Sequence, residues 1–217
     1  MIHSVSMNSR DDWLKARLKY IGGSEASAIV GMNPYMSSYD LWLLKTRQRK
    51  PEELDDNPFI IYGQKAEEYL RQLFILDYPE YKMEYYPNTI FVNDRYPYAH
   101  ASLDGLLTDR KGRTGIWECK TSMIQNPIQK MKWEGKIPEN YYCQICWYMA
   151  VLEADFAELK AQLKYEKNGN ILLITKHYHI ERGEVASDIE YLMSEARTFW
   201  NEYVIPKKAP PVVLPEI

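Results

Sequence analysis

The sequence predicts an α/β (α+β) fold, because helix-like and strand-like segments occupy distinct blocks of the chain. Segments with helical apolar spacing and capping residues fill residues 9–77. Strand-like stretches separated by turns follow to residue 121, and helices and strands then alternate. No repeat and no internal linker interrupts this order. A chain of 217 residues can bury one well-filled core, so we expect a single domain over residues 1–205.

Several expected helices begin at a capping residue or after a break in the chain. Ser9 followed by Asp12 resembles a capping box. Ser24 comes directly after Gly22-Gly23 and is expected to be an N-cap, and Asn57-Pro58 opens a longer helix. The helices are expected over residues 9–19, 24–30, 38–45, 58–77, 127–134, 138–152 and 184–204. A Pro-rich tail over residues 206–217 should be extended.

The expected strands are rich in aromatic and β-branched residues and are separated by turn residues. One turn is expected over Asp109–Gly115. The strands are expected over residues 82–86, 89–92, 98–103, 116–121, 156–165 and 171–179.

Composition limits the class of protein. Hydrophobic residues make up 46% and charged residues 26% of the chain, as in an ordinary globular protein. The formal net charge of -3 excludes a broadly basic nucleic-acid binder, so any DNA must be bound by local patches. Residues 1–10 lack the basic start and apolar centre of a secretory signal, and the 3 cysteines cannot all pair. We therefore expect a cytoplasmic protein.

The most informative motif combines Asp104-Gly105 with Glu118-Cys119-Lys120. In a strand over residues 116–121, side chains alternate between faces, so Glu118 and Lys120 project together. The expected strand over residues 98–103 would deliver Asp104 to the same place. Two hard carboxylate oxygens converging there suit Mg²⁺ or Mn²⁺, and Lys120 would lie where a water molecule must lose its proton. The motif therefore indicates a metal-dependent nuclease site.

The alternative is that these residues form an ordinary turn and a solvated strand face. Asp-Gly is a common turn dipeptide, and Glu-x-Lys is frequent on exposed strands. The surroundings favour the functional interpretation, because Ile116 and Trp117 belong to the same strand and a small-residue run precedes Asp104.

Five segments of the chain form an ordered set of motifs. They are Arg17–Ala26, Tyr62–Glu67, Ala101–Gly105, Trp117–Lys120 and Tyr141–Gln144. In order and spacing these segments resemble the phage lambda exonuclease (YqaJ-type viral recombinase) family, a branch of the PD-(D/E)XK nucleases. The resemblance extends from Arg17 to about Leu152.

This resemblance implies a PD-(D/E)XK restriction-endonuclease-like core, in which helices flank a central mixed β-sheet. It also implies a Mg²⁺-dependent 5′→3′ exonuclease that degrades one strand of a linear duplex and leaves 3′ overhangs for recombination by strand annealing. A ring-shaped homotrimer, a single-strand annealing protein as partner, and a phage or prophage origin in a bacterial host are further implications.

The resemblance assigns roles to particular residues of this chain. Asp104 and Glu118 become metal ligands, the main-chain carbonyl of Cys119 a third ligand, and Lys120 the group that orients or deprotonates the attacking water. Glu67 corresponds to the family's helix carboxylate, which binds metal directly or through water.

Gln144 and Tyr148 form the Q-x-x-x-Y pattern of related nucleases. One helical turn separates them, so both can face the site. Gln144 is expected to serve catalysis and Tyr148 to contact DNA. A polar pair in an amphipathic helix is the alternative.

Arg17 and Ser24 are the candidates for binding a terminal 5′-phosphate. Free N–H groups at a helix N-terminus and a guanidinium fork both favour a phosphate. The alternative is that Ser24 is only an N-cap and Arg17 a surface residue.

Two other functions use the same fold. A PD-(D/E)XK endonuclease or a single-strand-specific nuclease would need Asp104, Glu118 and Lys120 in the same roles. A non-catalytic DNA-binding protein would retain the fold without the chemistry, and the intact set of two carboxylates and a lysine argues against it.

Overall fold

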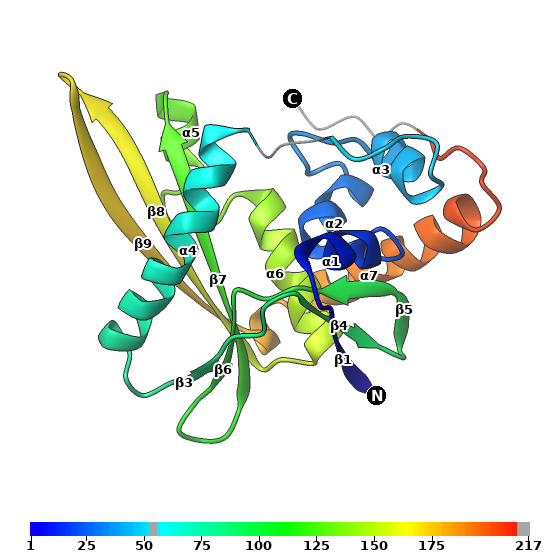
Figure 1. Ribbon diagram of the computed structural model, residues 1–217, viewed down its shortest axis with the longest axis horizontal. Helices are drawn as coiled ribbons and strands as arrows, with labels where there is room; N and C mark the ends of the chain where they lie inside the picture. Colours follow the sequence, from blue (N-terminus) through cyan, green and yellow to red (C-terminus); the bar gives the residue numbers. More distant parts are fainter. Residues whose placement is uncertain (53–55, 212–217) are drawn as a thin grey trace.

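A computed structural model describes residues 1–52 and 56–211 of the chain (Figure 1). The part of the predicted Pro-rich tail from residue 212 onward lies outside the described residues. The helices are α1 (Arg10–Arg17), α2 (Gly23–Ile29), α3 (Ser38–Lys45), α4 (Pro58–Asp77), α5 (Pro127–Met131), α6 (Glu139–Leu152) and α7 (Ala186–Phe199), with a 3₁₀ turn at Arg182–Glu184 and a π-helical turn at Trp200–Val204.

The strands form two mixed sheets, which confirms the predicted fold class and adds a second sheet to it. One sheet has the order β3-β6-β7-β8-β9, with β7 and β8 parallel and the other neighbours antiparallel. The other has the order β1-β4-β5-β2, with β2 parallel to β5. The strands are β1 (Ile2–Ser6), β2 (Ile21–Gly22), β3 (Lys82–Glu84), β4 (Thr89–Asn93), β5 (Tyr96–Ala101), β6 (Gly105–Thr108), β7 (Thr114–Ile124), β8 (Phe156–Lys167) and β9 (Asn170–Glu181).

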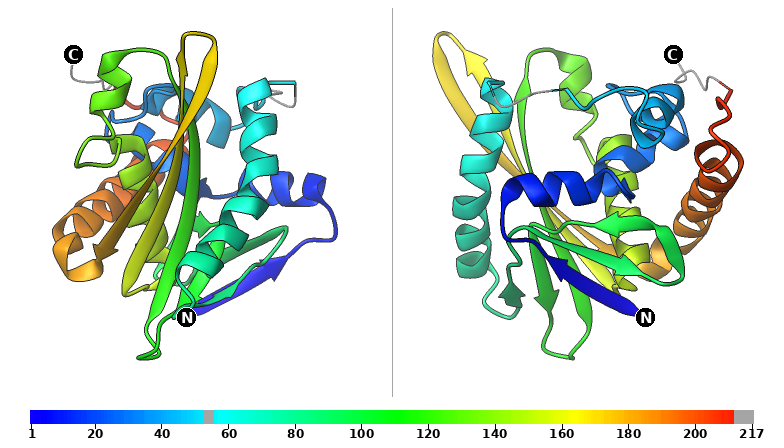
Figure 2. Two further views of the ribbon diagram at one scale, coloured as in Figure 1. Left: turned by 90° about the vertical axis from the view of Figure 1, so that its left-hand side faces the viewer. Right: turned by 45° about the vertical axis from the view of Figure 1, so that its right-hand side comes forward.

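The larger sheet is covered by helices on both faces (Figures 1 and 2). α4 packs on one face through a small core that contains Phe74 of the helix and Trp117 of β7. α6 packs on the other face, within the main core, where Ile145 and Trp147 are fully buried. In the described part of the chain, no helix is both long and apolar enough to span a membrane.

The strand predicted over residues 98–103 is β5, which starts and ends two residues earlier than expected. β5 belongs to the smaller sheet, and the chain passes from one sheet to the other between Ala101 and Gly105. β6 starts directly after Asp104 and pairs with β7, with Gly105 opposite Trp117. Asp104 thus reaches β7 from a bend between the sheets, and not from the end of a neighbouring strand.

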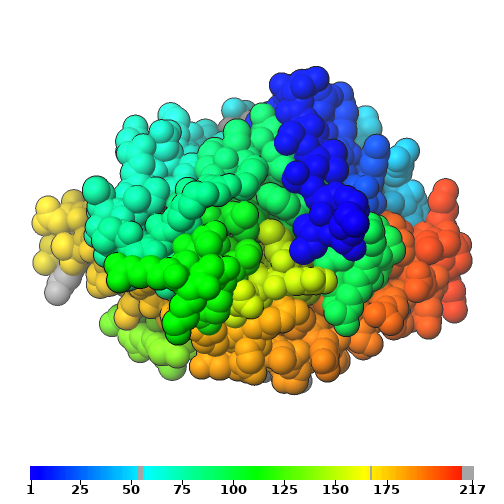
Figure 3. Space-filling view, turned by 90° about the horizontal axis from the view of Figure 1, so that it is seen from below, coloured from blue at the N-terminus to red at the C-terminus, as the bar shows by residue number. Residues whose placement is uncertain are grey.

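β1 is a second difference, because no strand was expected at the N-terminus. All its residues are exposed, and its register with β4 places Ser4 opposite Phe91. Figure 3 shows this blue segment at the surface beside the green strands of the smaller sheet. A strand without a buried face has no alternating apolar pattern, so the sequence gives no signal for it.

Candidate active site

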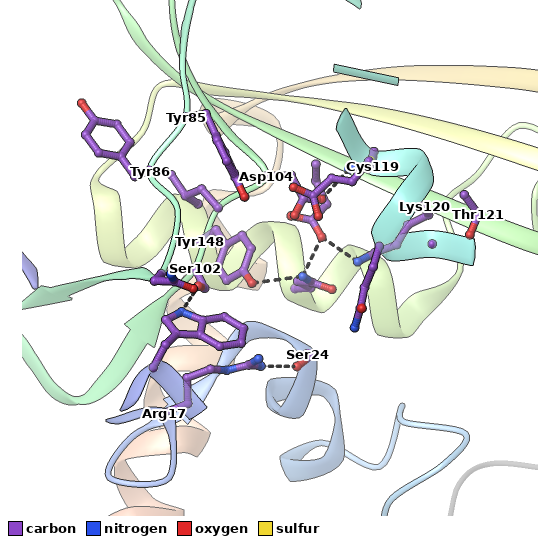
Figure 4. A pocket seen from close by; sticks show the side chains of 18 of the residues that line it. Arg17, Ser24, Tyr85, Tyr86, Ser102, Asp104, Cys119, Lys120, Thr121 and Tyr148 are labelled. Atoms are coloured by element: carbon purple, nitrogen blue, oxygen red, sulfur yellow. Dashed lines mark hydrogen bonds and ion pairs between the residues drawn. The ribbon is translucent and has the colours of Figure 1, made fainter. Parts of the chain in front are cut away.

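All nine residues singled out from the sequence line one open pocket of about 380 Å³ (Figure 4). They come from α1, α2, α4, the bend before β6, β7 and α6. The pocket lies at the edge of β7, where the pairing with β6 ends at Trp117. The residues are Arg17, Ser24, Glu67, Asp104, Glu118, Cys119, Lys120, Gln144 and Tyr148.

Glu118 and Lys120 share one face of β7, as the strand alternation predicts. The Nζ atom of Lys120 lies 2.6 Å from Oε1 of Glu118. Trp117 and Cys119 project to the opposite face and join the small core under α4. Gln144 Nε2 donates to the same Glu118 oxygen at 2.7 Å. The other oxygen, Oε2, is buried and accepts no hydrogen bond from the described residues.

Asp104 occupies the free edge of β7 beyond the start of β6. Its Oδ2 accepts a hydrogen bond from the main-chain N–H of Cys119 at 2.9 Å, where a further strand would otherwise bond. The N–H and C=O of one strand residue point to the same side of the strand. The carbonyl of Cys119 therefore faces the edge where Asp104 lies.

Glu67 reaches the pocket from α4, and its carboxylate is held by Arg71 one turn later. Nη1 of Arg71 donates to Oε1 of Glu67 at 3.0 Å and to the main-chain oxygen of Asp104 at 2.6 Å. The guanidinium also lies 3.6 Å from the centre of the Tyr85 ring. Arg71 was missed in the sequence. The i,i+4 spacing from Glu67 was the available signal, but the contact with Asp104 depends on the fold.

The three carboxylates repel one another in a buried setting. Burial, reinforced by the charge of Asp104, raises the pKa of Glu118 to about 8. The same two causes raise the pKa of Glu67 to about 6, although Arg71 opposes them. Burial by itself would lower the pKa of Lys120, but the nearby Glu118 and Asp104 outweigh it and raise that pKa. Lys120 is therefore positively charged. The three carboxylates carry more negative charge than Lys120 can balance once they are ionised, and a bound cation would reduce their repulsion.

The residues fit a hard divalent cation that keeps part of its water shell. In residues 1–52 and 56–211, no three His, Cys, Asp or Glu side chains are already grouped to hold a metal by themselves. Glu118 Oε2, however, is a buried carboxylate oxygen without a partner, and Asp104 and the Cys119 carbonyl lie at the same edge. Mg²⁺ typically takes one or two carboxylates and several waters, so this oxygen-only donor set suits it.

Gln144 and Tyr148 face the site together from α6. Gln144 Nε2 lies 3.1 Å from the Tyr148 hydroxyl, so its amide joins Tyr148 to Glu118. Both side chains are buried. Gly23 packs directly on the Tyr148 ring, where an added Cβ would lie 2.4 Å from Cε1. This close approach explains why a glycine is needed at the start of α2.

Arg17 and Ser24 lie next to each other, with Arg17 Nη2 3.5 Å from Ser24 Oγ. Ser24 is not the N-cap, which corrects the sequence expectation. Gly22 is the N-cap of α2, and Glu25 accepts a hydrogen bond from its N–H at 2.8 Å. Glu25 thus supplies the half of a capping box that a glycine N-cap allows, and the Ser24 side chain lines the pocket.

Trp13 and Ser102 are pocket residues that the sequence analysis did not assign to the site. The Arg17 guanidinium lies 4.4 Å from the centre of the Trp13 ring, and Trp13 Nε1 donates to Ser102 Oγ at 3.0 Å. Trp13 lies one helical turn before Arg17 in α1. Its i,i+4 spacing from Arg17 was the signal that it supports this side chain.

Residues 12–157 match the family described as the YqaJ-like viral recombinase domain. The chain is 30% identical over 203 residues to the uncharacterized protein YqaJ of Bacillus subtilis (strain 168), which covers 93% of this chain. The chain spans 59% of the length of that relative.

Two solved structures show the same fold. An alkaline exonuclease (LHK-Exo) from Laribacter hongkongensis has a TM-score of 0.62 and 17% identity, covering 91% of this chain and 96% of that one. A phage related exonuclease from Haemophilus somnus 129PT has a TM-score of 0.50 and 15% identity, covering 94% of this chain and 91% of that one. The expected PD-(D/E)XK-like core, a mixed sheet flanked by helices, is thereby confirmed.

Proposed function

The chain belongs to the YqaJ-like viral recombinase family, and from that premise we propose that it is a Mg²⁺-dependent 5′→3′ exonuclease. It degrades one strand of a linear DNA duplex and leaves a 3′ single strand for recombination by annealing. The observation that carries the proposal is the convergence of Asp104, Glu118 and Lys120 in a single pocket. Mn²⁺ is the expected substitute metal.

Each pocket residue would have a separate role in phosphodiester hydrolysis. Asp104, Glu118 and the Cys119 carbonyl would hold the metal, with Glu67 binding it directly or through water. A bound divalent ion lowers the pKa of a coordinated water and neutralises charge that develops on the phosphate. Lys120, charged and fixed by Glu118 at 2.6 Å, orients the attacking water and stabilises the transition state. Gln144 donates to the same Glu118 oxygen at 2.7 Å and helps to fix that carboxylate.

The 5′→3′ polarity rests on Arg17 and Ser24. Their side chains lie at one end of the pocket that also contains the carboxylates. The Trp13 ring holds the Arg17 guanidinium on one side, so its N–H groups are oriented for a terminal phosphate. Tyr148 contacts the DNA between this end and the carboxylates. A terminal phosphate bound there sets the strand that is cut.

Membership of the family supports the remaining proposals. We propose that residues 1–205 form one exonuclease domain, that the protein is a homotrimer around DNA, and that a single-strand annealing protein receives its product. It would act in the cytoplasm of a bacterium that carries the phage or prophage. A monomer in sedimentation at working concentration would contradict the trimer.

The decisive assay uses a linear duplex with a 5′-phosphate on one strand and a 5′-hydroxyl on the other, beside a closed circular duplex. We expect nucleotides only from the phosphorylated strand, only with Mg²⁺, and none from the circle. Asp104→Asn should abolish release, whereas Asp94→Asn, a carboxylate 64% exposed and outside the pocket, should not. Cutting of the circle would favour an endonuclease, and loss of cutting under every condition would favour a non-catalytic DNA-binding protein.

A further inference from the structure

Tyr85 differs from the other aromatic side chains of the pocket, because it is the most exposed of them. Four aromatic residues line the pocket. Tyr148 is buried under Gly23, and Trp13 is covered by Arg17. The Tyr86 hydroxyl donates to Glu84, and its ring meets Phe91 edge-on. Tyr85, by contrast, is 48% exposed.

Arg71 fixes the position of Tyr85 relative to the carboxylates of the pocket. The guanidinium covers one face of the ring at 3.6 Å from its centre, and the same guanidinium binds Glu67 and the main chain of Asp104. Arg71 is itself 9% exposed, so this stack is anchored in the protein. Because Arg71 covers one ring face, we assign the exposed part of Tyr85 to the face turned away from Arg71, which a ligand could contact. Figure 4 shows Tyr85 beside Asp104 in the pocket.

We propose that the free face of the Tyr85 ring is the stacking platform for the nucleobase of the nucleotide being removed. The inference rests on the proposed nuclease function and names the base subsite within it. Stacking on an aromatic ring accepts every base, because each base has a π-face. A platform fixed to the carboxylates would therefore orient the scissile phosphate without selecting a sequence, as digestion of arbitrary DNA requires.

The test compares a normal 5′-terminal nucleotide with an abasic one in a 5′-phosphorylated duplex. Release of the first residue is measured in single turnovers for wild type, Tyr85→Ala and Tyr85→Phe. Base stacking on an aromatic side chain corresponds to roughly 5- to 150-fold in a rate or binding constant. We expect the wild type to release an abasic first residue more slowly than a normal one by that factor. Tyr85→Ala should release a normal first residue more slowly than the wild type by the same factor. Tyr85→Phe should retain the wild-type rate.

The diagnostic result is that Tyr85→Ala releases an abasic first residue as fast as it releases a normal one. If the substitution and the missing base instead reduce the release rate by independent factors that multiply, the base does not stack on Tyr85 and the proposal is overturned. The matched control is Tyr69→Ala, a tyrosine of α4 that is 71% exposed and outside the pocket, which should cut like wild type.

A second readout does not depend on cutting. In EDTA, a 2-aminopurine at the 5′-terminal position should be quenched by wild-type protein and by Tyr85→Phe, but much less by Tyr85→Ala. Equal quenching by all three would overturn the proposal. A wild type that releases no nucleotide from any duplex would instead refute the nuclease function, so the two failures are distinguishable.

Discussion

Acid should weaken the folded state through His100, a buried imidazole of β5. Its side chain is 1% exposed, and Nδ1 lies 3.0 Å from the main-chain oxygen of Ile21. Nδ1 therefore donates, and Nε2 is unprotonated and accepts no hydrogen bond. Burial, with smaller repulsion from Arg17 and Lys45, lowers the pKa of His100 to about 3.

The direction and size of the effect follow from linkage. An unfolded histidine has a pKa of about 6.5, so below that pH the unfolded chain binds one proton more than the folded chain. The free energy of unfolding then falls by about 1.4 kcal/mol for each pH unit on the way down toward the folded pKa. Between pH 7.5 and 4.5 the loss from His100 alone should be about 2.7 kcal/mol. Above pH 6.5 the effect should vanish.

The measurement is urea unfolding of wild type and His100→Gln at pH 7.5, 6.0 and 4.5. Glutamine does not titrate, so the stability difference between the two proteins isolates His100 from all other acid effects. We expect this difference to shift by about 2.7 kcal/mol in favour of the variant as the pH falls. A pH-independent difference for His100→Gln would refute the reasoning.

Three further perturbations test the site itself. Gly23→Ala places a Cβ 2.4 Å from the buried Tyr148 ring and should cost about 1–3 kcal/mol in urea unfolding, whereas Gly183→Ala, with no atom within 4 Å, should be nearly neutral. Arg17→Lys removes the guanidinium fork, so the preference for 5′-phosphate over 5′-hydroxyl ends should fall by roughly 10-fold or more, and an unchanged preference in competition assays would exclude Arg17 as the phosphate ligand. Mg²⁺ at about 100 times its Kd should stabilise the wild type by about 2.7 kcal/mol in thermal unfolding, and equal stabilisation of Asp104→Asn would remove Asp104 from the metal site.

Local patterns in the sequence predicted much of this molecule. The helices expected over residues 38–45 and 58–77 match α3 and α4, because Ser37 and Asn57-Pro58 mark their starts by capping. The common face of Glu118 and Lys120 followed from strand alternation alone.

Features that depend on distant pairing were not predictable in this way. β1 pairs with β4 across some 90 residues of chain without burying a side chain. The short β2 has only two residues, which is too few for any pattern. The contact of Arg71 with the Asp104 main chain joins residues 33 positions apart and requires both sheets to be in place. The roles assigned to the pocket residues stay predictions until the assays above are done.

The parallel pairing of β7 with β8 sets an order of events during synthesis. A parallel neighbour needs a crossover, so α6 must be complete before β8 can pair with β7. Until then Glu118 lacks its hydrogen bond from Gln144, and the proposed hydrolytic centre is incomplete. If the proposed nuclease function holds, we expect a chain still being translated to leave the surrounding nucleic acid intact. The proposed activity would begin only after the second half of the larger sheet has emerged from the ribosome.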